Sequence, residues 1–319
     1  RAGPGSSTGP ALMMSEFELI ADITDGLAIG DDVLLGPGDD AAVLVPRGDV
    51  VVTTDVLIEN IHFKRSWSPA FQIGRKAVAV NVSDVEAMGA DPSAVVIGLA
   101  FPRNLEGRWI SDFQEGVVEE CARAGISLVG GDLSSAPQVA IAVTALGNLA
   151  GRAAVTRAGA RVGDQVAVCG RLGWSAGGLL VLQRGFGSPK ELVREQQCPA
   201  VPYGQGKIAA SAGATAMIDV SDGLLQDLGH ICERSGVGMD LETEALEIPE
   251  GLARLAAATG KNPLGFVLSG GEDHALAATF PADARLPQGW LRIGGVTSGA
   301  EVVVNGEPWQ GNVGWDHFA

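Results

Sequence analysis

The first half of the chain carries two kinds of hydrophobic pattern. Over residues 71–88 and 106–124, apolar side chains recur every three or four positions, which predicts two helices. Short apolar runs predict strands over residues 41–45, 50–56, 94–100, 126–129 and 139–149. The Pro-Arg-Gly-Asp stretch at 46–49 is the predicted turn that joins the first two strands. Hairpins and helices mixed in this way favour an α+β half over regular βαβ repeats.

A polar segment rich in glycine and arginine, residues 151–163, predicts a domain boundary near residue 150. Beyond it, strands are predicted over 165–168, 216–220, 237–242, 274–280 and 300–304. Helices are predicted over 175–184, 204–214 and 222–234. We therefore expect a disordered tag or leader at residues 1–13, an N-terminal domain at 14–150 and a C-terminal α+β domain at 151–319.

Composition and charge narrow the classes of function. With 319 residues, 46% of them hydrophobic, the chain can build two cores, and global disorder is excluded. Its net charge of −16 repels nucleic acid and anionic lipid, so we expect neither as a partner. No cysteine pair has the CxxC spacing, and no run of about 18 apolar residues could span a membrane. We expect a cytoplasmic protein, in which bound divalent metal would be needed to attract a phosphate ligand.

Carboxylates collect beside glycine or hydroxyl residues at the predicted ends of apolar strands. They are Asp39, Asp40, Asp55, Asp84, Asp132, Asp219, Asp222, Glu272 and Asp273. Any one of them alone is typical of a solvated surface charge, but the repeated placement indicates a shared ligand. Carboxylate oxygens are the ligands that Mg²⁺ prefers, and Mg²⁺ commonly joins one or two carboxylates to substrate phosphates.

Other nucleotide-binding signals are weak or absent. Asp219 and Asp222 flank a predicted strand-to-helix junction at which Ser221 is the expected N-cap, although Asp222 could simply complement the helix dipole. The Ser-Ala-Gly-Gly stretch at 175–178 could hold a phosphate at a helix start, but such starts are common. P-loop, protein-kinase, Rossmann and nucleophile-elbow motifs do not occur in the sequence.

Eight short strings stand in order along the chain. They are GPGDDAA at 36–42, TTDVLIENIHF at 53–63, AVNVSDVEAMGADP at 79–92, GGD at 130–132, TRAGA at 156–160, IDVSDGL at 218–224, SGGED at 269–273 and GWDHFA at 314–319. In this order they resemble the thiamine-monophosphate kinase family of the aminoimidazole-ribotide synthetase (PurM-like) superfamily. The resemblance covers residues 14–319. His274 departs from the family pattern, in which a Tyr often follows the GGED string.

The resemblance implies a two-domain α/β (α+β) PurM-like fold. Its N-terminal domain would carry a mixed sheet, bind metal and ATP, and form a homodimer, with each active site between the domains and near the dimer seam. The implied reaction is the in-line transfer of a phosphoryl group from ATP to thiamine monophosphate, the last step of thiamine diphosphate biosynthesis. Several Mg²⁺ ions are implied, and a monovalent cation such as K⁺ is allowed.

The same resemblance implies the site residues. The metal ligands would be Asp40, Thr53, Thr54, Asp55, Asp84, Asp132, Asp219 and Asp222. The ATP contacts would be Gly131, Asp132, Arg157 and Ser221. The contacts to thiamine monophosphate would be His62, Glu272 and Trp315. No side chain is implied as a catalytic acid or base.

The chemistry fits these residues independently. The acceptor is already a phosphate with a second pKa of about 6, so it is nucleophilic without a general base. The obstacle is repulsion between two polyanions, which bound metal relieves. Trp315 would offer an aromatic face to the cationic thiazolium, although His62, Arg157 and Trp315 could each be structural. Two alternatives stay open: an ATP-dependent cyclo-ligase of the same superfamily, and an acidic metal-binding scaffold without turnover.

Overall fold

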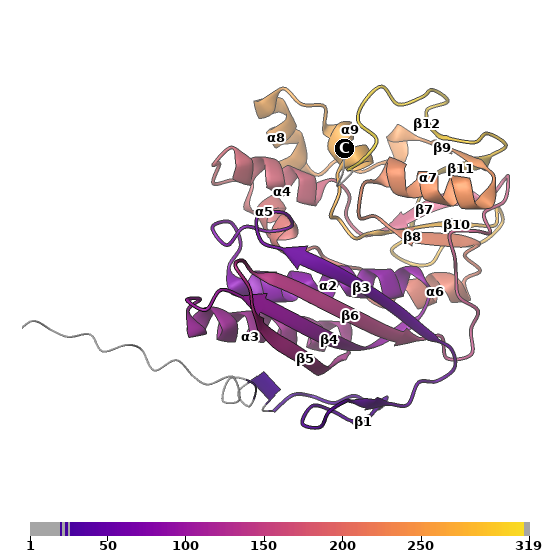
Figure 1. Ribbon diagram of the computed structural model, residues 1–319. Coiled ribbons are helices and arrows are strands. Elements are labelled where there is room, and N and C mark those ends of the chain that lie inside the picture. The colour runs from indigo at the N-terminus through magenta and orange to yellow at the C-terminus, as the bar shows by residue number, and fades with distance from the viewer. Residues whose placement is uncertain (1–19, 21–22, 25, 316–319) are drawn as a thin grey trace, which may run out of the picture.

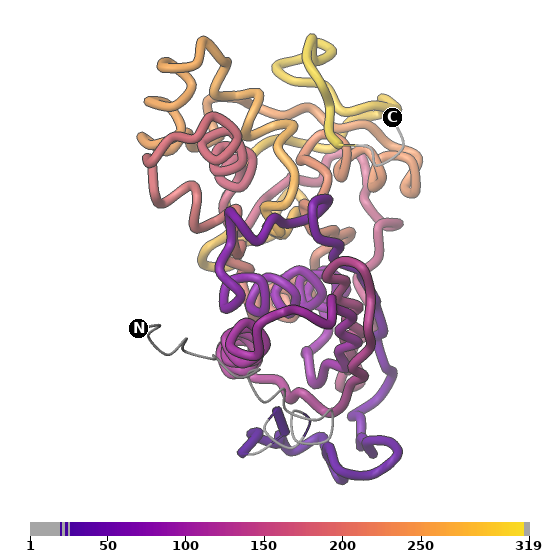
Figure 2. Tube along the Cα trace, turned by 60° about the vertical axis from the view of Figure 1, so that its left-hand side comes forward, coloured from indigo at the N-terminus to yellow at the C-terminus, as the bar shows by residue number. Residues whose placement is uncertain are grey.

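The computed structural model describes residues 20, 23–24 and 26–315, and the leader expected at 1–13 therefore lies outside the described residues. The described residues form two stacked α+β halves. Figure 2 shows the first half, indigo to magenta, beneath the second half, pink to yellow. The lower half is a four-stranded mixed sheet in the order β3 (Val50–Ile58), β6 (Ala140–Asn148), β4 (Asp91–Phe101) and β5 (Ser127–Ser135). Helices α2 (Ala70–Ala87) and α3 (Gly107–Ala124) cover one face of this sheet, as Figure 1 shows.

The upper half contains a six-stranded sheet. Its order is β12 (Val302–Val304), β9 (Gly238–Leu241), β11 (Leu291–Thr297), β7 (Gln165–Cys169), β10 (Leu276–Phe280) and β8 (Ala216–Asp219). Its helices are α4 (Trp174–Gln183), α5 (Lys190–Gln197), α6 (Gln205–Ser211), α7 (Leu224–Ser235), α8 (Glu250–Thr259) and α9 (Pro263–Ser269). The neighbouring strands of this sheet are antiparallel except β9 and β12, which confirms the expected α+β organisation.

Helix α2 runs between the two halves. It packs on β3 and β6 of the lower sheet and on β8 and β10 of the upper one. Most of its residues are therefore buried, which explains why the apolar residues from Ala77 to Ala87 are distributed around the whole helix instead of along one stripe. The polar side chains that α2 does carry are held inside the molecule, and each needs a partner there.

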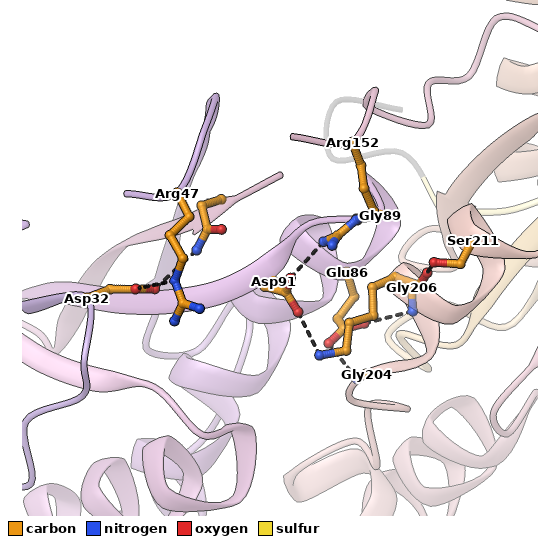
Figure 3. Close-up of polar contacts among 11 residues, drawn as sticks. Asp32, Arg47, Glu86, Gly89, Asp91, Arg152, Gly204, Gly206 and Ser211 are labelled. Atoms are coloured by element: carbon orange, nitrogen blue, oxygen red, sulfur yellow. Dashed lines mark hydrogen bonds and ion pairs between the residues drawn. The ribbon is translucent and has the colours of Figure 1, made fainter. Parts of the chain in front are cut away.

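Figure 3 shows polar contacts that fix the two halves to each other at the C-terminal end of α2. The buried Glu86 carboxylate accepts hydrogen bonds from the backbone N–H groups of Gly204 (2.6 Å) and Gly206 (2.8 Å), at the start of α6. Asp91 pairs with Arg152 and with Lys207 of α6, each at 2.7 Å. These charge-assisted bonds hold α6 against the lower half, so the groups that face each other across the boundary keep a defined relative position.

Two predictions about the lower half are wrong. Residues 41–45 do not form a hairpin with the following strand, because β2 (Val43–Leu44) pairs with β1 (Val33–Leu35) while β3 pairs with β6. The strand predicted to end at Val129 continues through Gly130, Gly131 and Asp132 as β5. Gly131 permits this, because a Cβ there would lie 2.2 Å from the carbonyl oxygen of Ile97 on β4.

Several short elements of the upper half were not predicted, namely α5, α8, α9 and β11. The glycines of the 175–178 stretch have a packing reason: a Cβ on Gly178 would lie 2.1 Å from the carbonyl oxygen of Leu192, so the stretch is glycine-rich where α4 meets α5. Within the described part of the chain, none of the helices combines the length and the apolar character needed to cross a bilayer.

Among the residues that the structure describes, no helix covers the second face of the lower sheet, and this face exposes apolar side chains. Val50, Val52, Val56 and Val96 are between 38% and 60% exposed. Cross-strand registers place Val56, Ala142, Gly98 and Asp132 in one row across all four strands. Asp132 therefore projects from this free face at the β5 edge, while β3 forms the opposite edge.

Candidate active site

The site begins where β3 passes over α2. Thr53 Oγ1 donates a hydrogen bond of 2.8 Å to Asp84 Oδ2 on the helix, and the backbone N–H of Asp55 donates to Asn81 Oδ1 at 3.0 Å. Because strand side chains alternate, Thr53 and Asp55 face α2 whereas Thr54 faces the free side of the sheet. Thr54 Oγ1 instead donates to the carbonyl of Val143 and accepts from Thr144.

Asp219, the last residue of β8, reaches the same helix from the upper half. Its Oδ2 accepts a hydrogen bond of 2.8 Å from Ser83 Oγ and lies 3.0 Å from His274 Nδ1. Ser83 Oγ also lies 2.9 Å from His274 Nδ1, so three buried polar groups meet at one point. Helix α2 thus brings Asp84 and Asp219 together although 135 residues separate them.

We call Asp55, Asp84 and Asp219 the interdomain carboxylate cluster. Burial, followed by the charges of Asp219 and Asp55, raises the pKa of Asp84 to about 7, although its hydrogen bond from Thr53 acts in the opposite direction. Burial also raises the pKa of Asp55, and the nearby charge of Asp219 adds to the shift. The carboxylates therefore repel one another in a poorly solvated place, which is the electrostatic setting that a bound cation would relieve.

His274 is the imidazole neighbour of this cluster. Burial alone would lower the pKa of His274, but its hydrogen bond to Asp219 and the charges of Asp219, Glu272 and Asp84 outweigh burial and raise that pKa. Its backbone has a φ of +49°, which is uncommon for a residue other than glycine. The His274 side chain thus places an imidazole ring against Asp219.

The donor set of the cluster fits Mg²⁺. Among residues 20, 23–24 and 26–315, no three or more His, Cys, Asp or Glu side chains are already gathered closely enough to hold a metal ion by themselves. Mg²⁺ does not require such a cage, because it usually keeps water and is bound through one or two carboxylates together with substrate phosphates. The hard, mutually repelling oxygens of Asp84 and Asp219 meet that requirement.

The loop after β8 carries Ser221 and Asp222 past the cluster. Ser221 is not the N-cap of α7: Gly223 is the cap residue, and the buried Asp227 carboxylate accepts the backbone N–H groups of Asp222 (3.1 Å) and Gly223 (3.0 Å). Burial, followed by the charge of Asp219, raises the pKa of Asp227 to about 7. The backbone N–H of Trp315 donates to the Asp222 carbonyl at 2.9 Å, so residue 315 lies against this loop.

Glu272 and His62 lie on two loops that approach α2. Glu272 has a φ of +64°, and its carbonyl accepts a hydrogen bond of 2.7 Å from Ser175 Oγ at the start of α4. His62 Nδ1 accepts the backbone N–H of Ile58 at 3.0 Å, so a neutral His62 ring carries its proton on Nε2. Of the three residues implied as substrate contacts, Trp315 is the most exposed, at 60%.

Asp40 and Asp132 lie elsewhere in the lower half. Both line a cavity of about 420 Å³ between α3, β5 and residues 37–42, together with Gly131. Arg157 is exposed after the domain boundary, and its carbonyl accepts from Ser235. The structure therefore brings Thr53, Asp55, Asp84 and Asp219 together, and leaves Asp40 and Asp132 at the opposite edge of the sheet.

The structural context differs from the expected one for one of the carboxylates. Asp132 lies inside strand β5, whereas it was predicted in a connection between two strands; Asp55 and Asp84 lie in the strand and the helix predicted over 50–56 and 71–88. Sequence reasoning also missed Lys76, Asn81 and Ser83, which support the site from α2. Their signal was present: they are polar residues inside an otherwise apolar helix, and buried polar groups require partners.

Asp273 gives a prediction about pH and stability. It accepts the backbone N–H groups of Gly173 and Ser175, and burial raises its pKa from 3.8 to about 7 against the effect of those bonds. The protonated form is thus favoured by folding, and its stabilisation is complete below pH 3.8 and lost as the pH rises through about 7.

We expect the Asp273→Asn variant to lose this part of the pH dependence. Between about pH 5 and 7 the parent protein's free energy of unfolding should fall more steeply than that of the variant, by up to about 1.4 kcal/mol per pH unit. Urea unfolding at several pH values measures the two slopes, with Asp112→Asn on the exposed side of α3 as the control. Equal slopes for parent and Asp273→Asn would contradict the prediction.

The comparisons with known proteins agree with this geometry. Residues 38–149 match the family described as AIR synthase related protein, N-terminal domain. A thiamine-monophosphate kinase of Mycobacterium tuberculosis is 47% identical over 309 residues, which cover 96% of this chain and 92% of the relative. The thiamine-monophosphate kinase of Aquifex aeolicus is 35% identical over 307 residues, covering 95% of this chain and 96% of the relative.

Solved structures show the same fold. The crystal structure of thiamine-monophosphate kinase from Stenotrophomonas maltophilia superposes with a TM-score of 0.79 at 35% identity, covering 91% of this chain and 95% of that one. A structure described as AaThiL complexed with AMPPCP and TMP superposes with a TM-score of 0.77 at 33% identity, covering 97% of this chain and 100% of that one. The PurM-like fold expected from the sequence motifs is thereby confirmed.

Proposed function

The chain belongs to the thiamine-monophosphate kinase family and transfers a phosphoryl group from ATP to thiamine monophosphate, and we propose that the transfer takes place at the interdomain carboxylate cluster. The observation that supports the location is that Asp84 of α2 and Asp219 of β8, which is hydrogen-bonded to the adjacent Ser83 of α2, come close enough for the charge of Asp219 to raise the pKa of Asp84. Two carboxylates placed in this way are suited to hold metal between two phosphate-bearing ligands, one from each side.

The surrounding residues act by holding these carboxylates in place. Thr53 orients Asp84 through its 2.8 Å hydrogen bond, while Ser83 and His274 orient Asp219. Asp227 fixes the loop that carries Ser221 and Asp222, which brings that loop to the phosphate region. None of these groups has to remove a proton from the acceptor, because the phosphate of thiamine monophosphate is already ionised.

Asp55, Asp84 and Asp219 are the proposed core of the Mg²⁺ set, with Thr53 beside them. When bound there, Mg²⁺ would supply the positive charge that an acidic protein lacks and would offset the repulsion between the two substrates' phosphates. Asp222 is the next carboxylate along the loop and extends the set. A role for K⁺ and a cytoplasmic location stay predictions from the sequence.

His62, Glu272 and Trp315 are proposed to contact the thiamine part. A carboxylate and an aromatic ring complement the cationic thiazolium, and the Nε2 proton of a neutral His62 ring provides a donor. Trp315 is tied to the site by its own main chain, since its N–H bonds to Asp222 and its carbonyl accepts from Gln226 Nε2 at 2.8 Å.

A homodimer is proposed from the free face of the lower sheet. Four partly exposed valines on one sheet face are typical of a surface that another chain covers. In an isologous pairing, the β5 edge of one protomer can lie across from the β3 edge of its partner. Such a pairing would bring Asp40, Asp132 and Gly131 of one chain to the carboxylate cluster of the other. The metal ligands implied by the resemblance would then lie at one site.

The acceptor specificity tests the proposed mechanism. We expect thiamine monophosphate to be phosphorylated and free thiamine to be inert, because the alcohol of thiamine would need a general base that the cluster does not provide. A coupled assay of ADP release with each acceptor measures this difference. Similar kcat/KM values for both acceptors would argue against the base-free mechanism, and turnover only with an amidine-forming substrate would favour the cyclo-ligase alternative.

Trp315→Ala tests the thiamine contact. Loss of a cation–π interaction of about 1–2 kcal/mol should raise KM for thiamine monophosphate by about 5- to 30-fold and leave KM for ATP nearly unchanged. Because the side chain is 60% exposed, the melting temperature should change little. Steady-state kinetics and thermal unfolding of the same preparation separate this result from a packing role, which would lower the melting temperature and leave both KM values in place.

A further inference from the structure

Lys76 is a buried cation at the boundary between the two halves. It lies on α2 and is only 2% exposed. Its Nζ donates to Glu272 Oε2 at 3.1 Å, to the carbonyl of Gln196 at 3.3 Å and to the carbonyl of His62 at 3.4 Å. The three acceptors belong to three separate segments, and they use all three donors of the ammonium group.

Two of these segments carry residues that we place at the thiamine part of the substrate. Lys76 therefore joins the loop of His62, from the lower half, to the side chain of Glu272, from the upper half. Glu272 is 36% exposed on its side chain, so one part of its carboxylate faces the buried ammonium while another part remains accessible. Its backbone φ of +64° also requires that the surrounding contacts hold the loop.

We propose that Lys76 is a positioning residue for substrate recognition, which sets the Glu272 carboxylate in the orientation that receives the cationic ring of thiamine monophosphate. This inference rests on the proposed role of Glu272. A buried ammonium needs all its acceptors, and a flexible Glu side chain loses rotamer freedom when it is held. Lys76 thus fixes the Glu272 side chain before the substrate binds. The loss of side-chain entropy of Glu272 then does not reduce the affinity for the substrate.

Lys76 lies too far inside the protein to be explained as a surface ion pair. Another interdomain lysine, Lys207, makes such a pair with Asp91 and is half-exposed. Both lysines join the two halves, but only Lys76 contacts residues placed at the substrate. If Lys76 acted only as a link between the halves, its removal would affect stability and both substrates alike, as removal of Lys207 would.

A double-mutant cycle tests the inference. Lys76→Met, Glu272→Gln and the double variant are compared for KM with thiamine monophosphate, KM with ATP, kcat and melting temperature, with Lys207→Met as the matched control. We expect each single variant to raise KM for thiamine monophosphate by about 10-fold, and the double variant to be no worse than either, because coupled neighbours do not add. KM for ATP should stay within about twofold of the parent value in all variants.

The outcomes separate the inference from the proposed site. If Glu272→Gln leaves KM for thiamine monophosphate unchanged, Glu272 is not a substrate contact, and both the proposed contact and the role of Lys76 fail. If Glu272→Gln raises that KM but Lys76→Met does not, or if the two effects multiply in the double variant, only the role of Lys76 is overturned. Should Lys76→Met fail to fold, Lys76→Gln keeps a neutral donor at the same place and is expected to show the same KM split.

Discussion

Replacing Asp84 by Asn should reduce kcat by at least about 10- to 100-fold while the protein stays folded. Loss of groups that only support metal ligands already costs that much, so loss of a direct ligand should cost no less. The two side chains have nearly the same shape, and the Asn oxygen can still accept the hydrogen bond from Thr53. The loss of activity would therefore report the missing charge and not a displaced strand.

The same substitution, Asp84→Asn, should not lower the thermal stability of the protein and should raise it at alkaline pH. Burial and the neighbouring carboxylates raise the pKa of Asp84 to about 7, so at pH 8 the folded protein holds an ionised group in an unfavourable place. Asn removes that cost, and the melting temperature of Asp84→Asn at pH 8 should equal or exceed that of the parent. Thermal unfolding and steady-state kinetics at the same pH test both parts, with Asp112→Asn as the surface control. A variant with full activity would remove Asp84 from the site.

The ordered motifs predicted the fold, whereas the assignment of the site residues stays a prediction. Asp84 and Asp219 could be chosen as partners from the ordered motifs, but only the burial of α2 on both sides shows how they meet. The strand through Asp132 was missed because Gly130 and Gly131 resemble a turn, whereas Gly131 is required by the close approach of Ile97 on the neighbouring strand. A single sequence contains the glycine but not the backbone that approaches it.

The hairpin at 41–56 failed for a similar reason. A Pro-Arg-Gly-Asp stretch between two apolar runs has the local sequence of a turn. However, β3 pairs antiparallel with the nine residues of β6, whereas β2 offers only two residues. Non-local pairing of this kind does not appear in local patterns. The polar residues of α2 were overlooked because the helix was treated as amphipathic, although Lys76, Asn81 and Ser83 stand on a helix that is buried nearly all round.

Asp132 and the interdomain carboxylate cluster lie at opposite edges of one sheet. How both could belong to one active site cannot be answered from the sequence. Neighbouring strands lie about 4.8 Å apart, so three strand spacings put the two edges about 14 Å apart. One protomer alone would need a large rearrangement to join them. In the dimer that we propose, the β5 edge of one protomer would lie across from the β3 edge of its partner, and each site would then take Asp84 from one protomer and Asp132 from the other.

Heterodimers decide between these arrangements. Asp84→Asn and Asp132→Asn are each expected to abolish most activity in their homodimers. When the two variants are co-expressed with different affinity tags and the mixed dimer is purified, one of its two sites contains neither substitution if the sites are shared between protomers. That dimer should then recover about half of the parent's kcat per dimer.

The control is a mixed dimer of the parent chain with Asp84→Asn, which should show about half of the parent activity in either arrangement because one site stays intact. If every site is built within a single protomer, the mixed dimer of the two variants has one substitution in each site and stays as inactive as the homodimers. Failure to isolate any mixed species, together with a monomer mass in solution, would contradict the dimer itself. Recovered activity would instead assign Asp132, and with it the cavity that Asp40 lines, to the active site of the partner.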